Sequence, residues 1–538
     1  MPRRRLFFWL VTLALPLALF TVAEAIVRLT LSDTVGDDAY LNLVDVPSFF
    51  ATRRVDGRRY YQVSHPEAYR GRKILFPVQK SPGSVRIFAL GGSASAGWPH
   101  PPGEIYTAYL KRALEQAYPD RDFEVINVSA HAYAAYRVRL IFDNVIRFEP
   151  DLVVLYSGNN EFLERRSYLA RSRALAGAVS WANHSALFRL LRSQLVSQLF
   201  PENSLSAKQR EDAREGVAAK LRQQAVELRR DPEQFARLMD HYAYSVRSMV
   251  EDARAAGVPV VLATVPVNLR DWRPNASHNQ LAGAARDRWR QTFDEGRAAL
   301  LRGDSEGAVR AFEQALALEP EHAESWFLVG RARELQGAPD RAFEAYGRAR
   351  DLDHNPFRAL SEQNAILRRI AAEEEGVTLV DLEAAFNGSA AAGAGFDLFL
   401  DYVHPTRDGN LLVARTVFET LLESKIFGSP TGEIGFPSAP HDPQAYDEDR
   451  DPRLQTTRFA LMAVMHQYQG MVDQARRLRA AGVTLPMAQE VLEVFPPYLE
   501  LERRRLLALP VDPAEARRIE AAYRRFYSDG GAGGGSLR

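Results

Sequence analysis

The 538-residue sequence contains no cysteine. This absence excludes disulfide bonds, thiolate nucleophiles, zinc sites built from cysteine, and iron–sulfur clusters. Any nucleophile in the chain is therefore an oxygen or a nitrogen atom. An excess of one charge is also absent, because 68 lysine and arginine residues balance 68 aspartate and glutamate residues. Without a net charge to attract polyanions, a nucleic-acid partner is not expected.

Three common catalytic or nucleotide-binding motifs are missing as well. The sequence has no G-x-S-x-G nucleophile elbow, no G-x-x-x-x-G-K-[ST] phosphate loop and no H-E-x-x-H zinc motif. We therefore predict that the protein uses no nucleotide, metal or other cofactor. The composition is that of a large folded protein, since 46% of the residues are hydrophobic and 25% are charged. The length corresponds to about three domains.

One long uncharged run lies near the N-terminus, at residues 6–23. As a helix it would be about 27 Å long, close to the thickness of the hydrocarbon layer of a membrane. Three arginines at positions 3–5 precede it and would remain in the cytoplasm. We therefore predict a single-pass anchor, with the rest of the chain extracytoplasmic, which means periplasmic in a Gram-negative cell. A cleaved signal peptide is the alternative, because Ala23–Ala25 resembles a cleavage site.

Five apolar runs beyond residue 80 have the length and composition of buried β-strands. Helical stretches separate them, for example Ile105–Ala117 between the first two runs. Strands that alternate with helices predict a mostly parallel sheet covered on both faces. The predicted strands are Val85–Leu90, Phe123–Val128, Leu152–Tyr156, Val258–Val265 and Val377–Leu382.

A stretch between the fourth and fifth predicted strands repeats itself at an offset of 34 residues. Gly296, Ala308 and Phe312 of the first unit align with Gly330, Ala342 and Tyr346 of the second. This period resembles the tetratricopeptide repeat, a pair of helices in which small residues permit close packing. Two repeats are fewer than the three usually needed to stand alone, so we expect them to lean on neighbouring helices. Binding of a protein partner and a purely structural role as a spacer both fit the pattern.

These patterns predict a domain order along the chain. The predicted parts are an anchor at 1–30, a polar stem at 31–80, the first part of the α/β domain at 81–288 with a helical insertion at 167–232, tetratricopeptide-like repeats at 289–355, the second part of the α/β domain at 356–426, and a helical C-terminal extension at 427–538. Within the extension we expect helices over Thr457–Ala481 and Met487–Leu509, the second broken at Pro496-Pro497. A flexible tail is predicted at Gly530–Ser536.

Polar clusters follow the first three predicted strands directly. They are Gly91-Gly92-Ser93, Ser129-Ala130-His131 and Gly158-Asn159-Asn160-Glu161. In open parallel sheets ligands bind where the carboxyl ends of the strands meet the loops, so these clusters should share one edge.

A fourth cluster, Asp401 to His404, comes after the fifth strand. An aspartate three residues before a histidine can accept one imidazole N–H, which leaves the other nitrogen to take a proton from a serine. Ser93 is the best placed serine, because the two glycines before it permit a sharp turn from strand to helix.

Together these four pieces resemble the SGNH (GDSL) hydrolase superfamily over about residues 81–165, 258–275 and 356–425. The resemblance implies a flavodoxin-like, three-layer α/β fold and acyl transfer through a serine ester. It makes Ser93 the nucleophile, His404 the general base and Asp401 its orienting carboxylate. It assigns the oxyanion to the backbone N–H groups of Ser93 and Ser129 and to the side chain of Asn160. Two residues depart from the usual pattern: Gly92 replaces an aspartate, and Ser129 replaces a glycine.

Several nearby residues are weaker candidates for the site. Ser95 is a second possible nucleophile, Asp397 a rival for Asp401, His100 and His131 could line the pocket, and Arg270 with Trp272 could hold an anionic or sugar group.

We therefore predict a serine esterase that acts on an acylated carbohydrate or lipid of the cell envelope. The ester that it cleaves would belong to a small molecule or to a glycan. Two alternatives stay open. One is a glycan O-acyltransferase with the same triad. The other is a catalytically silent assembly factor that holds envelope proteins through its repeats.

Overall fold

The computed structural model describes residues 18–27, 49–63, 69, 72–163, 187, 231–436 and 446–528. The chain divides into two compact units, of which the second comprises residues 54–60, 74–165 and 216–538. All the predicted site residues belong to this second unit.

A five-stranded parallel sheet forms the centre of the second unit, with the order β5-β4-β6-β7-β8. The strands are β4 (Ser84–Gly91), β5 (Asp122–Asn127), β6 (Leu152–Tyr156), β7 (Val260–Ala263) and β8 (Val377–Val380). Ile87 of β4 pairs with Val125 on one side and with Leu152 on the other. This is the flavodoxin-like order of a doubly wound sheet. In such a sheet the connections that leave β4 and β6 run in opposite directions, and ligands bind in the crevice between the ends of these two strands. The predicted α/β fold class is confirmed, and all five predicted strands are present.

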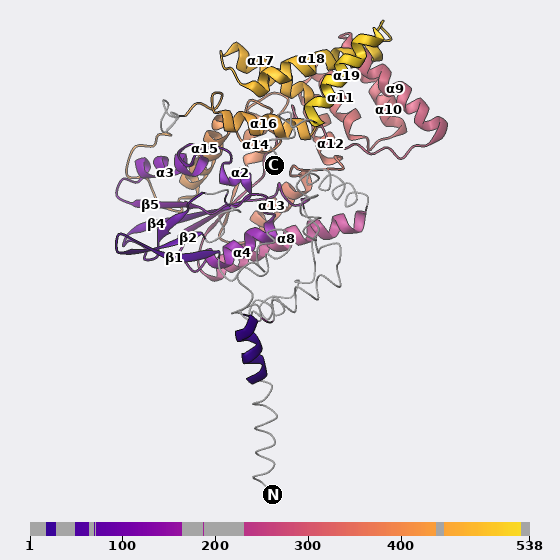
Figure 1. Ribbon diagram of the computed structural model, residues 1–538. Helices are drawn as coiled ribbons and strands as arrows, with labels where there is room; N and C mark the ends of the chain where they lie inside the picture. Colours follow the sequence, from indigo (N-terminus) through magenta and orange to yellow (C-terminus); the bar gives the residue numbers. More distant parts are fainter. Residues whose placement is uncertain are drawn as a thin grey trace. The chain divides into compact units, whose positions relative to one another are not determined.

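Helices cover both faces of this sheet (Figure 1). On one face α3 (Tyr106–Ala117) packs against α15 (Arg407–Ser424), and on the other α8 (Pro232–Ala255) packs against α4 (Ala135–Val145) and α13 (Ser361–Glu373). Every residue of β4 and β6 is buried as a result. The continuous apolar sequence of β6 is the pattern expected of a strand covered on both faces, and β4 departs from it mainly at Arg86, which forms an ion pair with Glu124.

Three further strands lie in the predicted stem and were not foreseen. They form a small sheet of order β1 (Phe50–Val55), β2 (Arg58–Val63) and β3 (Leu75–Pro77). Most residues of β1 are exposed, so no apolar run marks it in the sequence. Asp56 and Gly57 in the hairpin turn both have positive φ, and an Asp-Gly pair is a strong hairpin signal that was available.

The repeats form two helical hairpins, α9 (Gly283–Leu301) with α10 (Ser305–Leu318) and α11 (Ala323–Leu335) with α12 (Pro339–Asp351). Small residues do bring their helices together. A Cβ at Gly296 would lie 2.7 Å from the ring of Phe312, and one at Gly330 would lie 2.4 Å from the ring of Tyr346. The residues that recur at an offset of 34 in the sequence therefore make the same glycine-to-ring contact in both hairpins.

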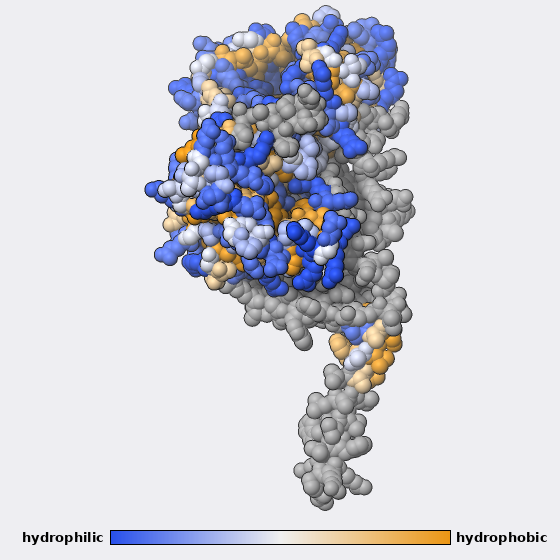
Figure 2. Space-filling view, turned by 90° about the vertical axis from the view of Figure 1, so that its left-hand side faces the viewer, coloured by the Kyte–Doolittle hydropathy of each residue, from blue (hydrophilic) through white to orange (hydrophobic). Residues whose placement is uncertain are grey.

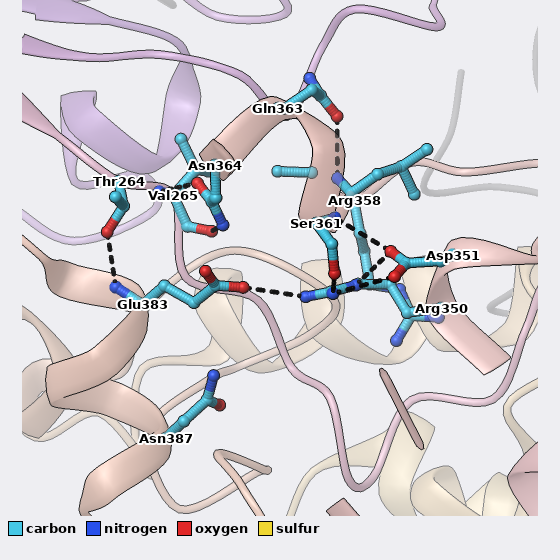
Figure 3. Close-up of polar contacts among 12 residues, drawn as sticks. Thr264, Val265, Arg350, Asp351, Arg358, Ser361, Gln363, Asn364, Glu383 and Asn387 are labelled. Carbon is cyan, nitrogen blue, oxygen red and sulfur yellow. Dashed lines mark hydrogen bonds and ion pairs between the residues drawn. The ribbon is translucent and has the colours of Figure 1, made fainter. Parts of the chain in front are cut away.

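The second hairpin packs against the α/β domain, in line with the support expected for so short an array. Tyr346 shares an apolar cluster with Leu269 and Ala392, which belong to loops of that domain. Figure 3 shows the polar part of the junction. Arg350, at the end of α12, forms an ion pair with Glu383 of α14 (Leu382–Gly388), with 3.1 Å between Nη1 and Oε1, and donates a hydrogen bond to Ser361 at the start of α13. A cavity of about 280 Å³ lies beside these residues, and no member of the predicted triad lines it.

A histidine at this junction of repeats gives a test of stability against pH. Nδ1 of His322 accepts the N–H of Ser325 at the start of α11, and burial lowers the pKa of His322 from 6.5 to about 4. Between these values the unfolded chain binds a proton that the folded chain excludes, so stability should fall as pH drops from 6.5 towards 4, by at most about 1.4 kcal/mol per pH unit. Above pH 6.5 this histidine should contribute no pH dependence.

Denaturant unfolding of the wild type and of His322→Asn across this pH range measures the effect. Asparagine keeps the capping acceptor without titrating, so the variant should lose less stability on acidification. Identical losses for the two proteins would show that His322 is not responsible.

The C-terminal extension contains α16 (Pro452–Val464), α17 (Tyr468–Ala480), α18 (Pro486–Leu506) and α19 (Pro513–Ser528). The predicted break at Pro496-Pro497 was wrong, because α18 continues through both prolines. Prolines remove backbone hydrogen bonds from a helix. Here packing offsets that loss, since the ring of Phe495 lies 5.1 Å from that of Tyr468 and 4.9 Å from that of Phe526.

The structure corrects the predicted membrane anchor. Residues 18–27 form a helix that exposes Leu19, Phe20, Val22 and Ile26, and its surface in Figure 2 is mostly hydrophobic. Among the described residues, however, no helix combines the length and the apolar character that crossing a membrane requires. The predicted localisation as a single-pass membrane protein is corrected by this finding. Residues 1–17, most of 167–232 and the tail at 530–536 lie outside the described residues.

Candidate active site

Ser93 and His404 are brought together although 311 positions separate them. Ser93 begins the short helix α2 (Ser93–Ala96) directly after β4, and His404 lies on the loop between α14 and α15. Nε2 of His404 lies 2.8 Å from Oγ of Ser93, and Nδ1 lies 2.6 Å from Oδ2 of Asp401. The three side chains therefore form one line of hydrogen bonds at the carboxyl edge of the sheet.

The surroundings of Asp401 determine which imidazole nitrogen of His404 carries the proton. Asp401 is 1% exposed, and its Oδ1 accepts the backbone N–H groups of Val403 and His404, both at 2.9 Å. Oδ2 is left to accept the proton on Nδ1 of His404. In the neutral imidazole Nε2 then has a free lone pair that faces the hydroxyl of Ser93, which is the arrangement that a general base requires.

A left-handed glycine ends α2 after a single turn. Gly97 has a φ of 72° and its N–H is bonded to the carbonyl of Ala94, so the chain reverses at once. The reversal returns Trp98 to the site, where its ring centre lies 4.6 Å from that of His404. Because Ser93 is the first residue of the helix, its own N–H has no acceptor within the helix.

Asn160 lies against the backbone just before Ser93. Its Nδ2 donates to the carbonyl of Tyr133 at 3.1 Å, and a Cβ at position 92 would lie only 2.3 Å from this nitrogen. Glycine at position 92 therefore leaves room for the Asn160 amide, which gives a physical reason for the departure from the usual aspartate. The amide has a second N–H, which can serve an oxyanion on Ser93.

Ser129 does not take the position that the sequence suggested. Its N–H donates to Oδ1 of Asn127 at 3.1 Å, and its hydroxyl donates to Oγ of Ser95 at 2.8 Å. With its N–H already bonded and its side chain buried, Ser129 is not available as an oxyanion donor. The left-handed residue of this loop is Ala132, with a φ of 58°, three positions later than the glycine of the family pattern.

The two rival residues are occupied elsewhere. Ser95 is fully buried, and its hydroxyl lies 3.1 Å from the hydroxyl of Tyr106. Asp397 accepts the N–H of Gly395 at 2.9 Å and forms an ion pair with Arg270 at 3.0 Å. Neither makes a hydrogen bond to His404 in the part of the chain that the structure describes.

The predicted substrate-binding pair is not brought to the site either. Trp272 is 0% exposed, and its Nε1 donates to Oδ1 of Asn275 at 3.2 Å. It belongs to the apolar cluster that contains the C-terminal helices. Arg270 forms ion pairs with Asp271 and Asp397, both at 3.0 Å. Both side chains therefore have structural partners in place of a ligand.

Two predicted neighbours and one unexpected residue surround the triad. The ring of His131 lies 6.0 Å from that of Trp98, and His100 is bonded to the carbonyl of Pro405. Arg458 of α16 lies over the ring of Phe396. Burial lowers the pKa of Arg458 to about 10, and the Asp401 carboxylate is among the charges that oppose this shift. No sequence pattern indicates that a residue of α16 lies near Asp401.

Comparison with known proteins identifies the repeats and similar solved structures. Residues 293–356 match the family model of the tetratricopeptide repeat. A search of curated proteins found no match. The chain is similar to the crystal structure of an acetyl xylan esterase, with 12% identity and a TM-score of 0.29, over 63% of this chain and 100% of that chain.

A GDSL-like lipase from Bacteroides thetaiotaomicron VPI-5482 has 12% identity and a TM-score of 0.27, over 64% of this chain and 92% of the lipase. An alpha/beta hydrolase from the metagenome of Lake Arreo, Spain, has 12% identity and the same score, over 63% and 95% of the two chains. At these identities and scores, the function has to be argued from the geometry of the site.

Proposed function

We propose that the chain is an SGNH-type serine hydrolase that cleaves carboxylic esters, with Ser93 as the nucleophile. The observation that carries the proposal is the line of hydrogen bonds from Ser93 through His404 to Asp401, at 2.8 and 2.6 Å. Such a line activates a serine hydroxyl, because the imidazole can take its proton while the carboxylate stabilises the imidazolium that forms. The order of the SGNH-like motifs along the chain supports the same assignment.

The reaction follows from these positions. Oγ of Ser93 bonds to the carbonyl carbon of the ester as its proton passes to Nε2 of His404. The N–H of Ser93 and the amide of Asn160 hold the negative carbonyl oxygen. His404 then gives its proton to the departing alcohol, which leaves an acyl ester on Ser93. A water molecule, deprotonated by His404, attacks this ester, releases the carboxylic acid and restores the hydroxyl of Ser93.

The acyl group and the alcohol stay open in this proposal. The expectation of a cell-envelope substrate rested on the predicted export and on the family resemblance, not on residues of the pocket. An activated ester such as p-nitrophenyl acetate is therefore the appropriate first probe. A glycan hydroxyl could replace water in the last step, in which case added glycan would become acylated. Hydrolysis predicts free acid with or without the glycan.

Covalent labelling tests the proposal directly. A fluorophosphonate should modify the full-length protein, and mass spectrometry of its peptides should locate the adduct on Ser93. Ser95→Ala is the matched control and should be labelled like the wild type, because Ser95 is buried two residues further along. If the wild type is neither labelled nor able to hydrolyse the ester, the proposal fails. The remaining interpretation would then be the catalytically silent assembly factor, which binds proteins through its repeats.

Asn160→Ala tests the oxyanion assignment. Loss of one such donor typically lowers kcat by about 100- to 1,000-fold, and KM should change little because the donor acts mainly on the transition state. Steady-state kinetics with p-nitrophenyl acetate measure both constants. Asn144→Ala is a suitable control, since it also removes an amide that donates to a backbone carbonyl, on α4. Equal kcat values for the two variants would contradict the role of Asn160.

A further inference from the structure

A buried histidine holds the backbone directly beside the proposed general base. His100 lies on the loop after Trp98, and its Nε2 is 2.8 Å from the carbonyl oxygen of Pro405, the residue that follows His404. Its Nδ1 is 2.5 Å from the hydroxyl of Tyr446, which belongs to the C-terminal extension. A hydrogen-bonded path therefore joins the extension to the loop of the catalytic histidine.

Only one arrangement of protons satisfies this path with neutral groups. A carbonyl oxygen can only accept, so the proton of the His100 ring must be on Nε2. Nδ1 then accepts, and the hydroxyl of Tyr446 donates. Burial lowers the pKa of His100 and raises that of Tyr446, so both groups are held in their neutral forms at physiological pH.

The segment that carries Tyr446 is attached to the same loop at a second point. Oε2 of Glu448 accepts the backbone N–H of Arg407 at 2.7 Å. The carbonyl oxygen of Glu448 in turn accepts a hydrogen bond from Nε2 of Gln455 on α16, at a distance of 2.9 Å. The backbone that leaves His404 is thus held at Pro405 and again at Arg407, and both contacts depend on the extension.

We propose that Tyr446 and His100 are positioning residues, through which the C-terminal extension holds the imidazole of His404 in place. The inference rests on the proposed function. Neither residue contacts Ser93 by a hydrogen bond, and both act through the backbone at Pro405. Nε2 of His404 must stay within hydrogen-bonding distance of Ser93, and a displacement of about 1 Å can reduce the rate by about 100-fold.

Removal of the Tyr446 hydroxyl is the smallest test. Tyr446→Phe should lower kcat for p-nitrophenyl acetate by about 10-fold, lower the rate of fluorophosphonate labelling by the same factor, and leave KM nearly unchanged. Tyr527→Phe is the matched control, because it removes another tyrosine hydroxyl of the extension, bonded to the carbonyl of Ala463. It should retain the wild-type rate.

The two positioning residues should also behave as one unit. His100→Leu removes the whole path, so adding Tyr446→Phe to it should cause little further loss. His100→Gln keeps an amide that can donate to Pro405, and it should recover part of the activity. Independent losses that multiply in the double variant would contradict the shared path.

A proton NMR spectrum separates this inference from the proposed function. The proton between His404 Nδ1 and Asp401 should give a far-downfield resonance that moves or disappears in Tyr446→Phe but not in Tyr527→Phe. If the wild type is an active esterase and Tyr446→Phe matches it in kcat and in this resonance, only the inference is overturned. If the resonance responds to Tyr446→Phe but the wild type neither hydrolyses esters nor is labelled, the inference stands and the proposed function fails.

Discussion

Replacement of Ser93 by alanine is expected to lower kcat for ester hydrolysis by about 10,000-fold or more and to abolish fluorophosphonate labelling. The hydroxyl removed is the one that lies 2.8 Å from Nε2 of His404, so the variant loses the group that the imidazole would activate. Folding should be unaffected, because alanine suits the first turn of α2 and Ser93 is partly exposed. Steady-state kinetics, fluorophosphonate labelling followed by mass spectrometry, and thermal unfolding measure the three quantities.

Ser95→Ala provides the opposite pattern and therefore a strict comparison. The change removes the buried hydrogen bonds that the hydroxyls of Ser129 and Tyr106 make with Oγ of Ser95, which should reduce stability by about 1–3 kcal/mol. Its kcat should stay close to that of the wild type. Activity that survives in Ser93→Ala but not in Ser95→Ala would move the nucleophile to position 95.

The sheet could be predicted from sequence because burial on both faces leaves a direct mark on the residues. Leu152–Tyr156 is apolar throughout and was placed without error as β6. The proximity of the proposed triad residues could be predicted for a related reason. Loops at the carboxyl ends of parallel strands must share one edge, so Ser93 and the Asp401–His404 pair could be expected to meet despite their separation. Their contact is decided by topology, which the alternation of strands and helices specifies.

Other parts of the site depend on local geometry that no residue pattern encodes. The N–H of Ser129 is not available because the side chain of Asn127 turns back to accept it. The left-handed conformation occurs at Ala132 instead of at position 129, and alanine is not a residue type that predicts this conformation. Similarly, Asn160 could be assigned to the site, but its close approach to the backbone of Gly92 appears only in the packed structure.

The C-terminal helices explain the errors around Trp272. An exposed tryptophan after a strand would suit a sugar, but Phe459 and Met471 of α16 and α17 share one apolar cluster with Trp272. The ring of Tyr402 lies 5.3 Å from that of Trp272, so this cluster reaches the residue next to Asp401. Sequence reasoning assigned the extension no part in the site because its docking is decided by long-range packing.

Asp401→Asn should be almost as damaging as loss of the nucleophile, with a fall in kcat of about 10,000-fold. Oδ1 of residue 401 faces two backbone N–H groups, those of Val403 and His404, so the asparagine must keep its oxygen there. Its NH₂ group then takes the place of Oδ2 and donates to Nδ1 of His404. The imidazole is forced into the other tautomer, with its proton on Nε2, where it can no longer accept a proton from Ser93.

Asparagine has nearly the size of aspartate and keeps the two backbone hydrogen bonds to Oδ1, so the melting temperature should change far less than the rate. Asp397→Asn is the matched control, because Asp397 also accepts a backbone N–H and forms an ion pair, with Arg270, on the same loop. It should retain most of the wild-type kcat. If Asp401→Asn is as active as Asp397→Asn, the carboxylate does not orient His404, and the hydrogen bond at 2.6 Å has only a structural role.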